Sequence, residues 1–215
     1  MTLNIQSVKQ EQIVFLRNQN IFTIAQRGVN TDSATGTLSG TDTITIDKPN
    51  VKNIRSITVG AVSKSLGKDY TADYNHTNGC VITFTSGQTG DYSVSYDYGS
   101  DKIYPDFPRD DLYISSYPRL AMDLLNVSTD AFGIGGSQFI SNVAFTIVAY
   151  SNNSDDLDGY IQSIKENYVS NAKNFYYLKF VKPTLIGPTI NSLDRSDEIM
   201  SKNIDLLGVF NIDTA

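Results

Sequence analysis

Residues 108–150 read PRDDLYISSYPRLAMDLLNVSTDAFGIGGSQFISNVAFTIVAY, and this stretch decides the fold. It contains two strand-like segments, 119–127 and 139–150, joined by a glycine-rich turn at Gly133, Gly135 and Gly136. In the second segment, apolar side chains fall on both faces: Phe139, Val143, Phe145 and Ile147 on one, and Ile140, Ala144, Val148 and Tyr150 on the other. Apolar residues on both faces are typical of a central strand that is covered on both sides. We therefore expect a sheet built around residues 139–150.

Helices are expected on both sides of this pair of strands in the sequence. Residues 5–20 carry a partial apolar stripe, and Ser7 and Gln10 have the spacing of a capping box. A second helix is predicted from Asp155 or Asp156, whose acidic side chains suit the positive end of a helix. Its apolar stripe consists of Leu157, Tyr160, Ile161, Ile164 and Tyr168. Further strands are expected at residues 176–181 and 202–212.

Residues 41–99 have a different pattern, with short segments in which apolar and polar residues alternate strictly. In the clearest segment, Tyr92, Tyr96 and Tyr98 share one face while Ser93, Ser95 and Asp97 take the other. Such alternation over successive segments predicts an antiparallel sandwich with one wet face. Asn78-Gly79 has the residues of a type I′ hairpin turn. Residues 27–40, rich in Gly, Thr, Ser, Asp and Asn, are predicted to be a loop that marks a boundary.

These patterns together predict an α+β protein with an insertion. The core, of residues 1–26 and 105–215, is expected to contain a mixed sheet with flanking helices. The inserted module, of residues 36–99, is expected to be an all-β, Ig-like sandwich with its own small core.

Composition excludes several classes of function. A net charge of −6 and a pI near 4.7 argue against a nucleic-acid-binding surface, which normally has a basic footprint. The first residues lack the apolar core of a signal peptide, and no apolar run approaches the ~20 residues that span a bilayer. Cys80 is the single cysteine, so neither an internal disulfide nor a cysteine metal site can form. We expect a chain that folds in a reducing cytoplasm and binds no membrane.

No residue pattern predicts catalysis. His76, the single histidine, lies beside the predicted turn, and Cys80 lies on a buried face, which disfavours a nucleophilic dyad. The glycine run leads into a strand, whereas a phosphate-cradling loop opens a helix. Adjacent acids such as Asp110-Asp111 and Asp155-Asp156 are expected to be solvated or to cap helices, although a metal-dependent hydrolase remains an alternative. The tyrosine face is expected to be core rather than a platform for carbohydrate. We expect no enzyme activity, cofactor or metal.

The chain resembles the neck and tail-terminator proteins of tailed bacterial and archaeal viruses over residues 1–26 and 105–215. The resemblance rests on the following segments: Tyr104-Pro105-Asp106-Phe107-Pro108-Arg109, Tyr117-Pro118-Arg119, Gly133-Ile134-Gly135-Gly136, the helix at 155–168 and Asp194-Arg195-Ser196-Asp197. It implies subunits that close into a ring, usually a hexamer, where the tail tube ends and the capsid connector begins. The inserted module is similar to small β-sandwiches that decorate virion proteins, and compact members of the family lack such an insertion.

The resemblance implies a structural virion protein, assembled from copies made in the host cytoplasm, that acts as a head–tail connector. Its expected partners are further copies of itself, the tail tube protein and the head-completion or connector protein, with DNA only passing through the lumen. The ring contact is expected at the sheet edges and flanking loops, in the set Arg109, Asp110, Asp111, Arg119, Asp194, Arg195, Asp197, Ile204 and Leu206. The alternative is a decoration or adhesion protein whose β module binds a receptor or glycan.

Overall fold

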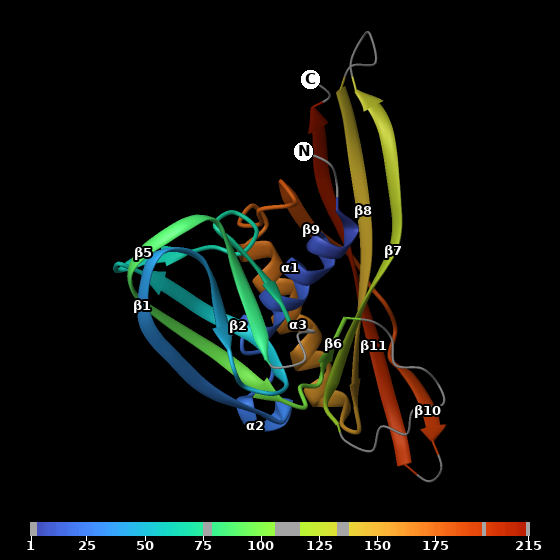
Figure 1. Ribbon diagram of the computed structural model, residues 1–215. Coiled ribbons are helices and arrows are strands. Elements are labelled where there is room, and N and C mark those ends of the chain that lie inside the picture. Colours follow the sequence, from blue (N-terminus) through green and yellow to red (C-terminus); the bar gives the residue numbers. More distant parts are fainter. Residues whose placement is uncertain (1–3, 75–78, 106–116, 133–137, 195–196, 214–215) are drawn as a thin grey trace. The chain divides into compact units, whose positions relative to one another are not determined.

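The computed structural model describes residues 4–74, 79–105, 117–132, 138–194 and 197–213 (Figure 1). The chain divides into two compact units, of which the first comprises Met1–Phe22 and Lys102–Ala215 and the second comprises Thr23–Asp101. The second unit is therefore an insertion into the first, and it is larger than the expected module of residues 36–99. Strands dominate both units and a few helices accompany them, so the α+β class fits.

The first unit is built around strand β8 (Gln138–Ser151), which pairs antiparallel with a long strand on each side. Its neighbours are β7 (Arg119–Phe132) and β11 (Asp197–Asp213). Three shorter strands complete the sheet: β6 (Ile103–Tyr104) lies parallel to β7, while β9 (Phe180–Ile186) and β10 (Ile190–Asp194) pair with β11. The order is β10-β11-β8-β7-β6, so the prediction of a central strand at residues 139–150 is confirmed.

Helices α1 (Ile5–Asn18) and α3 (Ser154–Ser170) lie on the same side of this sheet (Figure 1). The ring centroids of Phe15 on α1 and Tyr168 on α3 are 4.9 Å apart, so the two helices also contact each other. The core between helices and sheet contains Leu16, Ile161, Ile164, Met122, Val143, Phe145, Ile147, Ile204 and Leu206.

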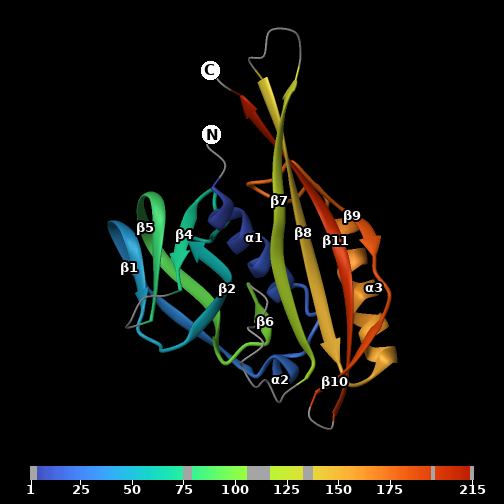
Figure 2. The same ribbon diagram turned by 90° about the vertical axis from the view of Figure 1, so that its right-hand side faces the viewer.

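The opposite face of the sheet carries no helix among the described residues (Figure 2). Ala144, Val148 and Tyr150 on this face of β8 are only partly buried. The expectation that β8 is covered on both sides is therefore wrong for the described part of the chain. Apolar residues on both faces indicated a strand covered on both sides, but partly exposed apolar residues such as these also occur on the uncovered face of a sheet.

Local signals place the helices well and the C-terminal strands less well. The N-cap residue of α1 is Asn4. Its side-chain oxygen accepts hydrogen bonds from the backbone N–H groups of Gln6 (3.0 Å) and Ser7 (3.3 Å). The expected capping box at Ser7 is therefore wrong. Helix α3 begins beside Asp155 and Asp156, as predicted. Strand β9 starts at Phe180 rather than at residue 176 and continues through Pro183, which a strand at the edge of a sheet tolerates.

The second unit contains a single five-stranded antiparallel sheet and one short helix, α2 (Ile24–Arg27). Its strands are β1 (Val29–Ile46), β2 (Val51–Val59), β3 (Val62–Lys64), β4 (Tyr70–Asp73) and β5 (Cys80–Gly99). Residues 29–40, expected to be part of a loop, form the first half of β1. That prediction is wrong because pairing with β5 supplies their backbone hydrogen bonds, which composition alone does not reveal.

Strand β5 organises the second unit, since it pairs with β1 on one side and with both β2 and β4 on the other. The predicted hairpin between β4 and β5 is confirmed, although Asn78 of its turn lies outside the described residues. Tyr96 is 4% exposed, and Tyr92 and Tyr98 pack against the same core, so the expected placement of the tyrosine face in the core is confirmed.

The turn before β5 requires glycine. Gly79 has a φ of +133°, and a Cβ at this position would collide with the carbonyl oxygen of Ile46. Gly79→Ala should therefore destabilise the second unit by about 1 kcal/mol or more, which thermal unfolding would show. Gly159→Ala is the matched control, because no atom lies within 4 Å of the added carbon on α3. That change should stabilise the protein by up to about 1 kcal/mol. Equal melting of both variants would contradict the strained-turn assignment.

Candidate functional site

Many of the candidate residues lie outside the part of the chain that the structure describes. These are Gly133, Gly135 and Gly136 of the predicted tight turn, Arg109, Asp110, Asp111 and Arg195 of the expected ring contact, and His76. Asp194 and Asp197 are described only in their backbone, where they form the last pair between β10 and β11.

Ile204 and Leu206 are not exposed for a ring contact. Their side chains are 0% and 1% exposed and belong to the core of the first unit. Along this part of its length, β11 lies between β8 and β9 and is not an edge of the sheet. Their assignment to the interface is therefore wrong, because β9 covers the side on which a neighbouring copy was expected to pair.

Arg119 is held by aromatic rings at the start of β7. Its guanidinium carbon lies 4.5 Å from the ring centroid of Tyr150 and 5.2 Å from that of Tyr117. Such cation–π contacts orient the side chain and partly satisfy its charge. These contacts fix the Arg119 side chain at the start of β7, whether or not a partner binds there.

Cys80 and the acidic residues were the groups considered for catalysis from the sequence. Cys80 is fully buried, and burial raises the pKa of its thiol to about 12, so the reactive thiolate does not form near neutral pH. No three His, Cys, Asp or Glu side chains in the described ranges lie close enough together to hold a metal ion. Asp155 and Asp156 occupy the first turn of α3, where their charge complements the helix dipole.

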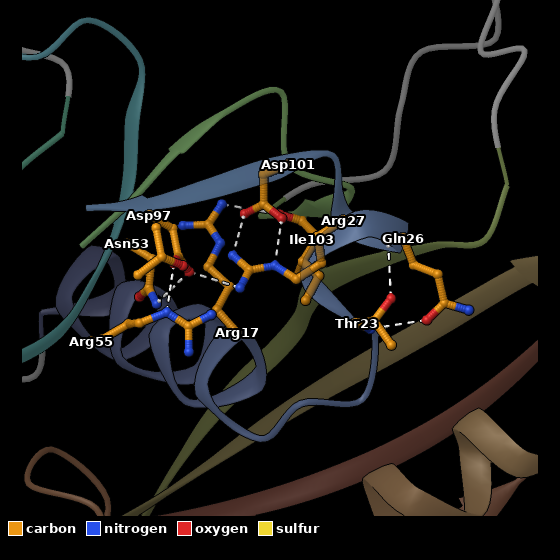
Figure 3. Close-up of polar contacts among 10 residues, drawn as sticks. Arg17, Thr23, Gln26, Arg27, Asn53, Arg55, Asp97, Asp101 and Ile103 are labelled. Carbon is orange, nitrogen blue, oxygen red and sulfur yellow. Dashed lines mark hydrogen bonds and ion pairs between the residues drawn. The ribbon is translucent and has the colours of Figure 1, made fainter. Parts of the chain in front are cut away.

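The most organised polar cluster is a buried ion network in the second unit (Figure 3). The guanidinium of Arg27 donates to Asp97 (2.8 Å) and to Asp101 (3.1 and 3.3 Å), and its side chain is 1% exposed. Asp97 also accepts from Arg55 at 2.5 Å, and Thr31 and Asn53 donate to the same carboxylate. Two arginines and two aspartates thus neutralise one another, and of the four only Arg55 is partly exposed, at 24% of its side chain.

Local structure positions Arg27 for this role. Helix α2 is fixed by a capping box in which Thr23 and Gln26 each accept a hydrogen bond from the other's backbone (Figure 3). Gly28 ends the helix with a φ of 69°, a conformation that glycine adopts without strain. One short helix therefore places the guanidinium over the end of β5.

The electrostatics of the network favour its charged form. Burial opposes the charge on Arg27, but the carboxylates of Asp101 and Asp97 raise its pKa above the ordinary value. Burial also opposes the charge on Asp97, yet the hydrogen bond from Arg55 and the charge of Arg27 hold the pKa of this carboxyl below its usual range. The four charges depend on one another, and the cluster serves as a structural anchor of the second unit.

Removing one member of this network should be costly. Arg27→Met leaves two buried carboxylates with too few partners, and we expect a loss of about 3–5 kcal/mol in the free energy of unfolding of the second unit. Amide hydrogen exchange of β1 and β5 would measure this loss. The control is Lys48→Met, which removes an exposed ion pair with Asp32 and should change exchange little. Similar protection in both variants would contradict the role of Arg27.

A second buried charge lies in the first unit, on α1. The Glu11 carboxylate is 9% exposed and accepts hydrogen bonds from the backbone N–H groups of Tyr176 (2.5 Å) and Tyr177 (3.3 Å). It thereby ties α1 to the segment before β9. Burial raises the pKa of Glu11 to about 7, although both hydrogen bonds favour the charged form. Tyr168 faces this carboxyl, and its own pKa rises through burial and the charge of Glu11.

This raised pKa predicts a pH dependence. The folded protein binds the Glu11 proton more tightly than the unfolded chain, whose ordinary pKa is 4.5. The free energy of unfolding should therefore fall as pH rises from about 4.5 to 7, by an amount on the order of 3 kcal/mol. Glu11→Gln should remove this slope, which denaturant unfolding of both proteins at pH 5 and pH 8 would measure. A constant difference between the two proteins at both pH values would be evidence against the assignment.

The sheet of the first unit has two unlike outer edges. Strand β6 pairs only with Leu120 and Ala121, so no described strand pairs with the outer side of β7 from Met122 to Phe132. On the other side, β9 is the outer neighbour of β11 from Ile204 to Val209. The N–H of Val181 donates to Ala172, and Pro183 has no N–H, so the outer side of β9 offers few backbone donors.

Sequence reasoning did not find Glu11 or the Arg27 network, and comparisons do not assign a role to either. No protein-family model matches the chain, and no curated protein is found as a relative. In the described residues, no helix has the length and apolar character needed to cross a membrane.

Proposed function

We propose that this protein is a structural, non-enzymatic virion protein of the neck, a tail terminator that joins the tail tube to the head connector as a ring. The observation that carries the proposal is the pair of unlike edges on the sheet of the first unit. On one side, the outer side of β7 from Met122 onward has no described partner strand; on the other side lies β9, whose outer side offers few backbone donors.

Unlike edges favour a ring over a symmetric dimer. A contact between two different surfaces of the same chain is head to tail, and it closes into a ring when the rotation between copies divides a full turn. A hexamer, as in the proteins that the sequence resembles, is the form we propose. The negative net charge of −6 suits a channel for DNA, because a wall without basic patches does not hold the passing phosphate backbone.

The inserted second unit, with its five-stranded antiparallel sheet, is proposed to be an appendage carried by the ring-forming part. An adhesion role in which its tyrosines bind glycan has less support, because Tyr96 is buried and Tyr92 and Tyr98 pack on the core. A hydrolase has less support again, since Cys80 is buried and the acids of the described ranges form no metal-binding group.

The test of the proposed function is the position and copy number of the protein in virus particles. Electron microscopy of particles with an antibody label should place it in one ring around the tail axis, next to the head. Particles made without it should contain heads and tails that fail to join. A single copy at a fibre tip, or copies spread over the capsid surface, would contradict the proposal.

A further inference from the structure

The outer edge of β7 is acidic. Its described open part, Met122–Asp130, contains Asp123 and Asp130 and no Lys or Arg. Asp130 is exposed, and Asp123 lies 3.7 Å from Lys9 with 38% of its side chain exposed. Leu125 is the extra residue of a β-bulge in this strand and is 57% exposed. We call Met122–Asp130 the acidic edge.

The opposite side of the same sheet is basic. Residues Lys179–Ile186 contain Lys179 and Lys182, both exposed, and no acidic residue. Neither lysine forms an ion pair with a residue that the structure describes. Leu185 is 59% exposed and Ile186 is 39% exposed. We call Lys179–Ile186 the basic edge.

The two edges lie at the same level of the sheet. Pairing continues in rows from Asp123 through Thr146 and Asp205 to Leu185, and from Asn126 through Ala144 and Leu207 to Lys182. A third row runs from Ser128 to Phe180. Rotation of one copy about an axis along the strands therefore brings the acidic edge of that copy beside the basic edge of the next.

Strand directions and side-chain directions also match. Strands β7 and β11 each run antiparallel to β8, and β9 runs antiparallel to β11, so β9 and β7 run in opposite directions. Asp123, Lys182 and Leu185 all lie on the face away from the buried Val143 and Val181, because side chains alternate along each strand. Asp123 of the acidic edge thus shares one face with Lys182 and the exposed Leu185 of the basic edge, while Lys179 lies just before β9.

We propose that the acidic edge of one copy binds the basic edge of a second copy, with Asp123 and Asp130 beside Lys179 and Lys182 and with Leu125 against Leu185. This inference rests on the proposed ring and names the surfaces that close it. The contact is made mainly by side chains, because Val181 and Pro183 leave β9 few backbone donors for strand pairing. Opposite charges on the two edges select this head-to-tail pairing and oppose edge pairing between two β7 strands.

Charge reversal on the full-length protein tests the contact. Lys179→Glu with Lys182→Glu makes both edges acidic, and Asp123→Lys with Asp130→Lys makes both edges basic. Each variant alone should associate at least about tenfold more weakly than the wild type, because like charges then face each other. An equal mixture of the two should recover the association, since every contact again joins an acidic to a basic edge. Sedimentation and native mass spectrometry at low salt measure all three states.

Matched controls change the same charges elsewhere. Lys64→Glu with Lys68→Glu, and Asp42→Lys with Asp47→Lys, lie in the second unit and should associate like the wild type. Added salt should weaken the wild-type association, because the contact is charged and exposed. Thermal unfolding verifies that each variant is folded, and recovery in the mixture requires that both are.

Three results would overturn the inference: a wild type that stays monomeric at every concentration and salt level, reversal variants that associate like their controls, or a mixture that fails to recover. If particles nevertheless show a ring around the tail axis, the proposed function is supported and the copies contact each other through other surfaces. Recovery in solution without a ring in particles would support the contact and contradict the tail-terminator role.

Discussion

The first unit depends on the pairing of β8 with a long strand on each side. Because β11 follows β8 residue by residue, and β7 does so apart from one bulge at Leu125, the register fixes which side chains of three strands face the helices. Met122, Ile147 and Ile204 come together in one buried row in this way. The same register sets the levels of β7 and β9 at the two sides of the sheet. A shift of one residue in either pairing would expose the core and misalign the charges of the two edges.

The sequence predicted those parts of the fold whose signals are local. Two such signals are the apolar faces of residues 139–150 and the apolar stripe of residues 157–168. Each arises from residues close together in sequence, and both elements form close to where they were expected. The first half of β1 was missed because it has loop composition and is held by β5, whose paired residues lie 50 to 70 positions away in sequence. Strand β9 begins later than predicted because pairing with β11, rather than the apolar run before Phe180, decides where it starts.

The polar sites were missed for a related reason. Alternation correctly placed Asp97 on the face opposite Tyr96, but it does not reveal that Arg27 covers that carboxylate. Glu11 lies within the predicted first helix, and its partners Tyr176 and Tyr177 come from a distant part of the chain. Ile204 and Leu206 were assigned to an interface because a terminal strand is often an edge, whereas β9 folds back beside it. Burial of a charge by a distant segment leaves no periodic trace in the sequence.

The Arg27 network has a consequence for how the insertion relates to its host. The ion pair between Arg27 and Asp101 joins positions 74 residues apart, at the beginning and the end of the second unit. This ion pair holds the two ends of the second unit close together, much as a short turn would. The length and sequence of the residues between Arg27 and Asp101 can then vary without a change in the backbone of the first unit. A different insertion could replace the second unit without a change in the first, provided that its two ends lie equally close together.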